Sequence, residues 1–136
     1  MNSLSRRWIA IGAVLGAIGV ALGAFGAHFL PDHLEYLGYG GSDLARRLDI
    51  FDTAVRYQLI HALAIVIIGF ALELRAVGPG RFAAWAFLIG VAIFSGLLKA
   101  MTVLGPQWNW LGAIVPIGGV SMIVGWVAVA VGALRK

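Results

Sequence analysis

The chain has 136 residues, of which 61% are apolar and 12% charged, whereas a soluble domain is about half apolar and about a quarter charged. So few polar side chains cannot cover a water-soluble domain of this size, and so many apolar ones exclude a disordered chain. The absence of Cys excludes disulfides, thiolate metal sites and Cys nucleophiles, and the net charge of +4 comes from residues at segment ends rather than from a nucleic-acid-binding stripe.

The first predicted element is a membrane-spanning helix over residues 8–30. No formally charged residue lies between Arg7 and Pro31, and this run meets the roughly 20 residues needed to cross about 30 Å of hydrocarbon. A cleaved secretory signal is the alternative, because two arginines precede the run and Ala24 and Gly26 would suit a small-residue cleavage site. The run is long for a signal, which favours the helix.

The loop after this span contains a predicted amphipathic helix over residues 42–53. Ser42 can cap its first turn. Apolar side chains recur at three- and four-residue spacing at Leu44, Leu48, Phe51 and Val55. The pattern predicts a helix that lies in the membrane interface and runs into the next span. Such a helix either seals the top of the bundle or forms a lid over a site.

Three further spans complete the predicted fold, an all-α membrane protein with four transmembrane helices. They cover residues 54–74, 81–104 and 111–134. The turn Val77-Gly78-Pro79-Gly80 separates the first two of them. Only Lys99 is charged between Phe82 and Leu134, a stretch too long for one helix, so we expect a hairpin at Gly105-Pro106. The whole chain, residues 1–136, is therefore one domain.

The distribution of Lys and Arg predicts that both chain ends lie on the cytoplasmic side, an N-in, C-in orientation. The N-terminal tail, the second loop and the C-terminus together hold Arg6, Arg7, Arg75, Arg81, Arg135 and Lys136. The first loop holds Arg46 and Arg47, with Arg56 at its edge, and the third loop holds no cation. Trp108 and Trp110 near the outer ends of the spans, and Trp8 and Trp85 near the inner ends, fit the two aromatic belts.

Glycines form a smooth face on two of the predicted spans. In the first span they stand at Gly12, Gly16, Gly19, Gly23 and Gly26. In the fourth they stand at Gly118, Gly125 and Gly132. Lipid supplies no hydrophobic force between helices, so small residues that let backbones approach closely are typical of helix contacts. The pattern favours packing within a compact bundle, with self-association or docking on a partner subunit as the alternative.

Polar side chains gather in the outer half of the predicted bundle. His28, His61 and Lys99 come from three spans but fall in one layer, with His61 about 9 Å inside its helix. Thr53, Tyr57 and His61 share one helix face, and Ser95, Lys99 and Thr102 share another. Ionisable groups inside a bilayer are costly and therefore functional candidates. The candidate ligand-binding cluster comprises His28, Asp52, Arg56, Tyr57, His61, Ser95 and Lys99.

Members of this cluster also have structural alternatives. Lys99 could extend to the outer headgroups, His61 could be a neutral imidazole bonded to a neighbouring helix, and His28 could cap or pack. Two histidines with Asp52 could bind a metal ion, but their spacing matches no established ligand motif. We therefore predict no metal site.

The sequence contains no recognisable catalytic or cofactor motif. No Ser, His and Asp stand in a nucleophile arrangement, and no Gly-rich phosphate motif with its Lys occurs. Catalytic residues are therefore unknown, and no cofactor is predicted. Below His61 and Lys99 no ionisable side chain occurs until Glu73 and the cations of the inner interface, so we do not expect a single copy to be a pump or channel.

Several short motifs occur in a fixed order along nearly the whole chain. They are Gly23-Ala24-Phe25-Gly26-Ala27-His28, Phe51-Asp52-Thr53-Ala54, Arg56-Tyr57, His61-Ala62, Phe94-Ser95-Gly96, Pro116-Ile117-Gly118-Gly119 and Gly125-Trp126. In this order they resemble the DUF423 family, which includes small bacterial membrane proteins and the eukaryotic transmembrane protein 256. The resemblance implies a four-helix protein of the bacterial inner membrane, or of the mitochondrial one in eukaryotes, and implies no activity. His28, Arg56, Tyr57 and His61 match the family pattern, whereas Lys99 stands where a tyrosine is expected, so the resemblance gives Lys99 no family-wide role.

Two functions fit these observations. The first is a non-enzymatic membrane module that packs on a larger membrane complex or binds lipid. The alternative is an outer-leaflet site that binds or acts on an amphipathic small molecule, a quinone or a lipid headgroup, through His28, Tyr57 and His61. The expected partners are membrane lipids, a membrane-protein complex or a second copy of the chain, and not nucleic acid. The expected location is the bacterial inner membrane, as a multi-pass protein.

Overall fold

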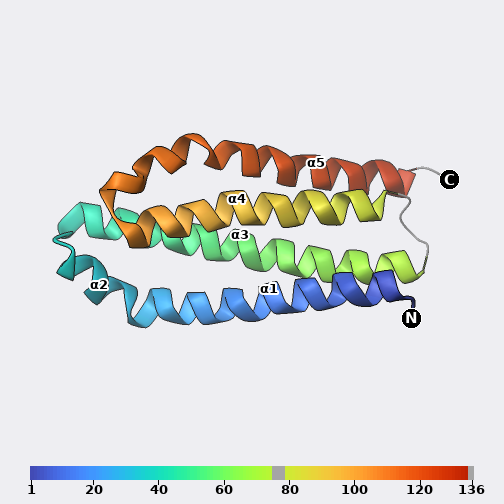
Figure 1. Cartoon of the computed structure of the whole chain (residues 1–136), viewed down its shortest axis with the longest axis horizontal. Helices are drawn as coiled ribbons and strands as arrows, with labels where there is room; N and C mark the ends of the chain where they lie inside the picture. Colours follow the sequence, from blue (N-terminus) through green and yellow to red (C-terminus); the bar gives the residue numbers. More distant parts are fainter. Residues whose placement is uncertain (75–78, 135–136) are drawn as a thin grey trace.

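The computed structural model describes residues 1–74 and 79–134, and within them the chain forms helices and no strands. In chain order the helices are α1 (Ser3–His28), α2 (Leu30–Tyr36), α3 (Gly41–Glu73), α4 (Gly80–Leu104), the 3-10 helix η1 (Pro106–Ala113) and α5 (Val115–Leu134) (Figure 1). Four of them, α1, α3, α4 and α5, are long and apolar enough to cross a membrane. The predicted all-α fold with four spans is confirmed.

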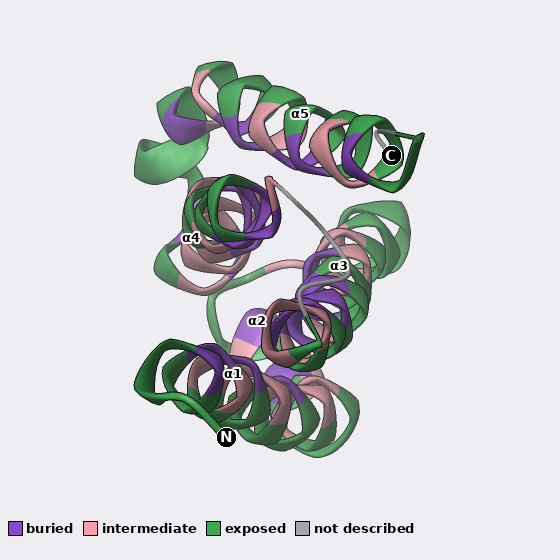
Figure 2. Ribbon diagram, turned by 90° about the vertical axis from the view of Figure 1, so that its right-hand side faces the viewer, coloured by how far each residue is buried: buried purple, intermediate pink, exposed green. Residues whose placement is uncertain are grey.

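The four long helices form a staggered row rather than a closed square (Figure 2). α3 packs against α1 on one side and α4 on the other, and α4 packs in turn against α5. α1 begins and α5 ends at the same end of the bundle (Figure 1), as four crossings require. The N-in, C-in orientation stays a prediction. Arg75, Arg135 and Lys136, which contribute to it, lie outside the described residues, as do Val77 and Gly78 of the predicted turn.

The glycines of α1 form its contact with α3. A Cβ added at Gly12 would lie 2.7 Å from the Ala62 carbonyl oxygen, and one at Gly26 would lie 2.9 Å from the Phe51 ring. Gly16, Gly19 and Gly23 also face α3. Because α3 covers these glycines, the α1 face is used for packing within the chain.

The glycines of α5 face α4 in the same way. A Cβ added at Gly125 would lie 2.6 Å from the Phe87 ring, and Gly118 lies against the backbone of Phe94. Gly132 is also buried, near the end of α5. Both glycine faces therefore bring neighbouring helices of one chain close together.

The predicted amphipathic helix over residues 42–53 forms and runs into the next span, as the first part of α3. α3 has 33 residues, so it is about 50 Å long, well beyond the roughly 30 Å of hydrocarbon. No proline or glycine lies between Gly41 and Ile68, and Asp52 and Arg56 pair across the expected junction at i,i+4 spacing. The segment therefore continues the span along its own axis.

The short helix α2 was not predicted. It begins with a proline in its first turn, where the missing N–H costs least. Leu30 and Leu34 are fully buried against Phe51 and Val55 of α3. α2 thus covers the part of α3 that extends past the end of α1 (Figure 1).

The helix η1 was also not predicted, and α5 begins later than expected. Gly105 turns the chain with φ 95°, η1 follows, and α5 starts at Val115. Pro116 has no N–H and its ring clashes with the carbonyl of the residue four positions earlier in an α-helix. An α-helix therefore cannot extend back from α5 through this position without a break.

Candidate functional site

The predicted cluster does not form a single site. His28 is exposed at the end of α1, whereas His61 is buried in α3 at 4% exposure. The contact between α1 and α3 sets their separation. Gly26 lies against Phe51, a position about ten residues, and therefore roughly 15 Å, before His61 along α3. The two histidines cannot share one small ligand in this arrangement.

His61 has hydrogen-bond partners on both ring nitrogens. Its Nδ1 donates to the Tyr57 carbonyl oxygen at 2.8 Å, and its Nε2 accepts from the Trp126 indole N–H of α5 at 3.2 Å. An indole N–H can only donate, so Nε2 carries no proton and the ring is the neutral Nδ1–H tautomer. The Tyr57 ring stacks on His61, and Phe87 packs against its edge. His61 therefore links α3 to α5 and has no free lone pair for a metal ion or a proton transfer.

Lys99 belongs to a second polar network, which joins α4 to α1 through α3. Its Nζ donates to Gln58 Oε1, and Gln58 Nε2 donates to the Leu15 carbonyl oxygen at 2.8 Å. Gln58 is 3% exposed and Lys99 is half-buried. The Lys99 side chain thus turns into the bundle rather than out toward the headgroups.

The Lys99 side chain also lines an apolar hollow between α1 and α4. This hollow has a volume of about 420 Å³ and is lined by Leu22, Phe25, Phe51, Lys99, Ala100, Val103 and Leu104. A second hollow of about 330 Å³ lies further along the same two helices and is lined by Ala10, Ile11, Val14, Leu15 and Leu88. We call the two hollows together the α1–α4 groove. From Ile11 to Phe25, α1 rises by about 21 Å.

The other predicted residues lie apart from this groove or are engaged locally. Asp52 and Arg56 form an ion pair with side chains 62% and 65% exposed, and exposed pairs of this kind contribute little to stability. Thr102 donates to the Leu98 carbonyl oxygen of its own helix at 3.0 Å. The Ser95 hydroxyl is fully buried and has no hydrogen-bond partner within residues 1–74 and 79–134.

Three further polar residues lie at helix contacts and were not among the predicted site residues. Gln58 connects Lys99 to α1, as described above. His33 Nε2 donates to the Val103 carbonyl oxygen at 3.2 Å, and Arg47 Nη1 donates to the Met101 carbonyl oxygen at 3.3 Å. The last carbonyls of a helix lack intrahelical partners, so polar residues near a helix end are natural donors to them. The sequence does not show which loop covers which helix end, and this is why His33 and Arg47 were missed.

The described side chains of the predicted cluster are held largely by contacts within the chain. No three His, Asp or Glu among them are placed to hold one metal ion, and His61 is occupied on both nitrogens. The Lys99 ammonium donates to Gln58 within the bundle, and its side chain borders hydrocarbon-lined space. This combination suits a molecule with an anionic group and a long apolar chain.

Comparison with known proteins places the chain in a family. The family described as "Protein of unknown function (DUF423)" matches residues 22–119. The UPF0382 membrane protein YwdK of Bacillus subtilis (strain 168) is 35% identical over 131 residues, covering 96% of this chain and 98% of that protein. The UPF0382 inner membrane protein YgdD of Escherichia coli (strain K12) is 34% identical over 132 residues, covering 96% and 92%. No solved structure matches the chain. The motifs, the four spans and these relatives together show that the chain belongs to the DUF423 family of membrane proteins.

Proposed function

We propose that this protein is a non-enzymatic membrane module that binds a long-chain anionic lipid in the α1–α4 groove. The anionic group contacts Lys99, and the acyl chain lies along the groove. The observation that carries the proposal is the position of Lys99, whose side chain lines an apolar hollow while its ammonium contacts only the neutral amide of Gln58. Among the described residues no carboxylate lies within 4 Å of its Nζ.

The energetics of Lys99 support an external anion. A lysine in the hydrocarbon region costs about 2.5–3.5 kcal/mol at the bilayer centre on insertion scales. Lys99 lies five residues, or about 7 Å, before the end of α4, so its cost is smaller than at the centre. Gln58 accepts one of its three N–H donors but brings no negative charge. A carboxylate or phosphate oxygen of a lipid would supply both an acceptor and a charge.

The groove has the length and lining that an acyl chain needs. α1 packs mainly on α3, and α4 packs on α5 and α3 rather than on α1, which leaves the space between α1 and α4 open to lipid. Its span of about 21 Å exceeds the roughly 15 Å of one leaflet, half of the hydrocarbon thickness. Lys99 meets Gln58, which donates to the Leu15 carbonyl oxygen, so the ammonium lies level with the middle of the groove, and a bound acyl chain would extend from it along one of the two hollows.

The proposal is tested with two ligands that share one chain and differ in charge, oleate and oleyl alcohol. Binding to the detergent-solubilised protein is measured by native mass spectrometry. We expect oleate to bind about tenfold more tightly, since charge-assisted hydrogen bonds contribute about 1.5–3 kcal/mol. Lys99→Met should remove this preference, whereas Lys99→Arg should retain part of it.

The matched control is Arg81→Met, which removes an exposed cation from the opposite end of α4 and should leave the preference unchanged. Equal binding of oleate and oleyl alcohol by the unmodified protein would contradict the proposal. An equal loss of preference in Arg81→Met would also contradict it, because the effect would then be one of net charge.

A further inference from the structure

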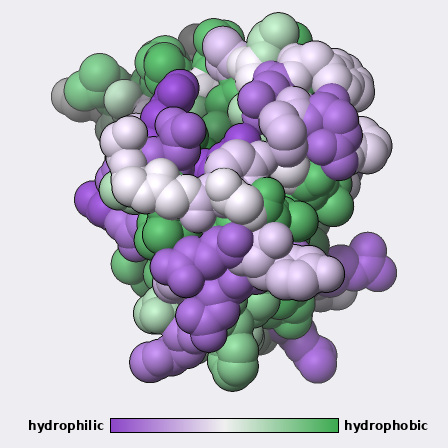
Figure 3. Space-filling view, turned by 90° about the vertical axis from the view of Figure 1, so that its left-hand side faces the viewer, coloured by the Kyte–Doolittle hydropathy of each residue, from purple (hydrophilic) through white to green (hydrophobic). Residues whose placement is uncertain are grey.

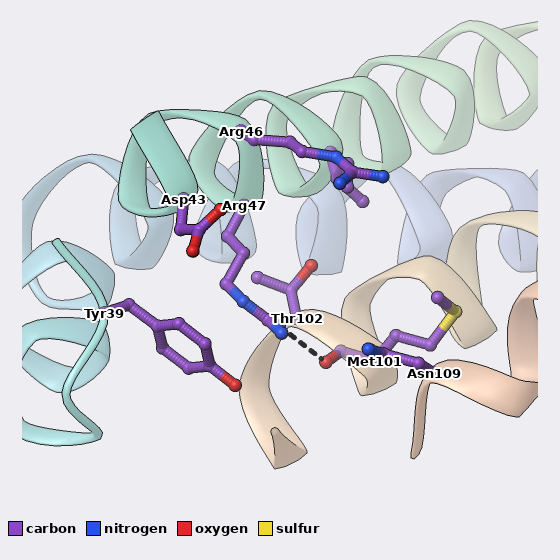
Figure 4. Close-up of a pocket in the computed structure, with 8 residues that line it drawn as sticks. Tyr39, Asp43, Arg46, Arg47, Met101, Thr102 and Asn109 are labelled. Carbon is purple, nitrogen blue, oxygen red and sulfur yellow. Dashed lines mark hydrogen bonds between the residues drawn. The ribbon is translucent and has the colours of Figure 1, made fainter. Parts of the chain in front are cut away.

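A polar cavity lies at the end of the bundle where α2 and η1 are found, separate from the α1–α4 groove (Figure 4). It has a volume of about 400 Å³ and is lined by Tyr39, Asp43, Arg46, Arg47, Ile50, Met101, Thr102 and Asn109. Hydrophilic side chains gather on this end of the molecule (Figure 3). We propose that this cavity binds a phosphate group, carried either by a lipid headgroup or by a small soluble phosphate ester.

Arg47 is held in place by contacts on two sides. Its guanidinium carbon lies 3.9 Å from the centre of the Tyr39 ring, and its Nη1 donates to the Met101 carbonyl oxygen (Figure 4). A guanidinium has five N–H donors in one plane, and only one of them is used in this contact. A guanidinium fixed in one plane is preorganised for a bidentate contact with phosphate.

Further donors surround the cavity from separate segments of the chain. Arg46 lies next to Arg47 in the same turn of α3, and Asn109 comes from η1 across the cavity (Figure 4). Arg46 forms no ion pair with any residue that the structure describes. The Tyr39 hydroxyl is enclosed and has no hydrogen-bond partner in this part of the chain. Buried polar groups normally have a partner, but solvent does not reach this hydroxyl, so Tyr39 contributes its ring rather than a donor to the site.

The positive charge of the cavity favours an anion, and Asp43 allows the sign of the bound charge to be tested. Arg46, Arg47 and the carboxylate Asp43 line the cavity, and neither arginine forms an ion pair with Asp43; the Arg46 side chain runs along α3 away from Asp43 (Figure 4). Asp43 should repel a bound phosphate, and it should attract a bound cation. The volume corresponds to about a dozen water molecules, which leaves room for the glycerol or ester group that carries the phosphate.

Two arms of one experiment distinguish the two sources of phosphate. Both arms use the Lys99→Met variant in lipid nanodiscs, so that lipid bound at the α1–α4 groove does not contribute. In the first arm the nanodiscs contain only phosphatidylcholine, and glycerol phosphate is titrated by calorimetry. In the second arm half of the lipid is phosphatidylglycerol, and retained lipid is counted by native mass spectrometry. Binding in the first arm identifies a soluble ester, and preferential retention in the second arm alone identifies a lipid headgroup. No binding in either arm overturns the proposal and leaves the proposed function of the groove untouched.

Substitutions in the cavity provide the second readout. Arg46→Gln should weaken the observed binding about fivefold, and Asp43→Asn should strengthen it by about the same factor. Arg81→Gln and Asp49→Asn, which change charge at exposed positions outside the cavity, should leave binding unchanged. Weaker binding in Asp43→Asn would overturn the proposal, because it would show that the cavity prefers a cation. Loss of binding in Arg81→Gln equal to that in Arg46→Gln would overturn it as well.

Discussion

His61 and Lys99 show how two ionisable residues in neighbouring spans acquire different roles from their partners. His61 meets a carbonyl acceptor on one nitrogen and a donor-only indole on the other, and these contacts fix a neutral ring. Lys99 meets a neutral amide, which accepts a hydrogen bond without balancing the charge. The first residue therefore links two helices, and the second joins α4 to α3 while its charge is left without a carboxylate partner among the described residues.

The link between α3 and α5 gives the first prediction at this scale. Trp126→Phe keeps an aromatic ring beside Phe87 but removes the donor to His61 Nε2. Hydrogen bonds between membrane helices contribute about 0.6 kcal/mol on average and at most about 1.7, so we expect a loss of roughly 1 kcal/mol in the free energy of unfolding. Denaturation in mixed detergent micelles, followed by circular dichroism, measures it.

A double-mutant cycle with His61→Leu separates this bond from the loss of packing. If the bond is formed, the effects of the two single substitutions should add to more than the effect of the double variant. Strictly additive effects would show that the indole and the imidazole do not interact.

At the scale of helices, substitution of two neighbouring α1 glycines by alanine should have different effects on stability. A Cβ at Gly12 would lie 2.7 Å from the Ala62 carbonyl oxygen, whereas one at Gly16 would lie 4.0 Å from the Ala62 Cβ. Gly12→Ala must therefore push α1 away from α3, and we expect it to cost about 1–3 kcal/mol of stability. Gly16→Ala adds an ordinary contact and should change stability by less than about 0.5 kcal/mol. Thermal unfolding of both variants in one detergent tests the difference, and equal effects would show that α1 does not approach α3 as closely at Gly12 as the structure has it.

The four spans could be predicted because only complete helices satisfy the backbone of an apolar chain in lipid. The length of each apolar run therefore predicts a spanning helix. Arg7 lies in the first turns of α1, Glu73 ends α3, and Gly105 directly follows α4. The helices α2 and η1 could not be predicted in this way. Each has fewer than ten residues and is stabilised by burial against α3 or α4 rather than by a periodic pattern of its own.

At the scale of the whole molecule, the order of the helices around the bundle decides which polar residues meet, and the sequence does not contain it. The layer of His61 and Lys99 was predicted from depth alone, yet the two residues face different neighbours. His61 faces α5, while Lys99 meets Gln58 on the side toward α1. Gln58 carries no charge and stands one residue after Tyr57, so nothing in its spacing marks it as the residue that joins three helices. The groove likewise follows from a staggered row of helices, which no single segment predicts.

The orientation of this row decides from which side of the membrane a ligand reaches each site. The chain contains no Cys, so single cysteines introduced by substitution can be labelled without background. We predict that Tyr36→Cys, which is 88% exposed after the first span, and Gln107→Cys in η1 react with an impermeant maleimide added to intact spheroplasts. Ser3→Cys at the start of α1 should react only after the membrane is permeabilised, because cations accumulate on the cytoplasmic side.

The pattern of labelling distinguishes a wrong first membrane crossing from a reversed orientation. Reaction of Tyr36→Cys and Ser3→Cys from the same side would contradict the first membrane crossing and with it the depth assigned to Lys99. Reaction of Ser3→Cys alone in intact spheroplasts would keep all four crossings and reverse the orientation. In the predicted orientation the phosphate cavity opens at the outer surface, and Lys99, about 7 Å from the same end of α4, faces the outer leaflet. Both sites would then take their ligands from that side of the membrane, and neither would need a route through the bundle.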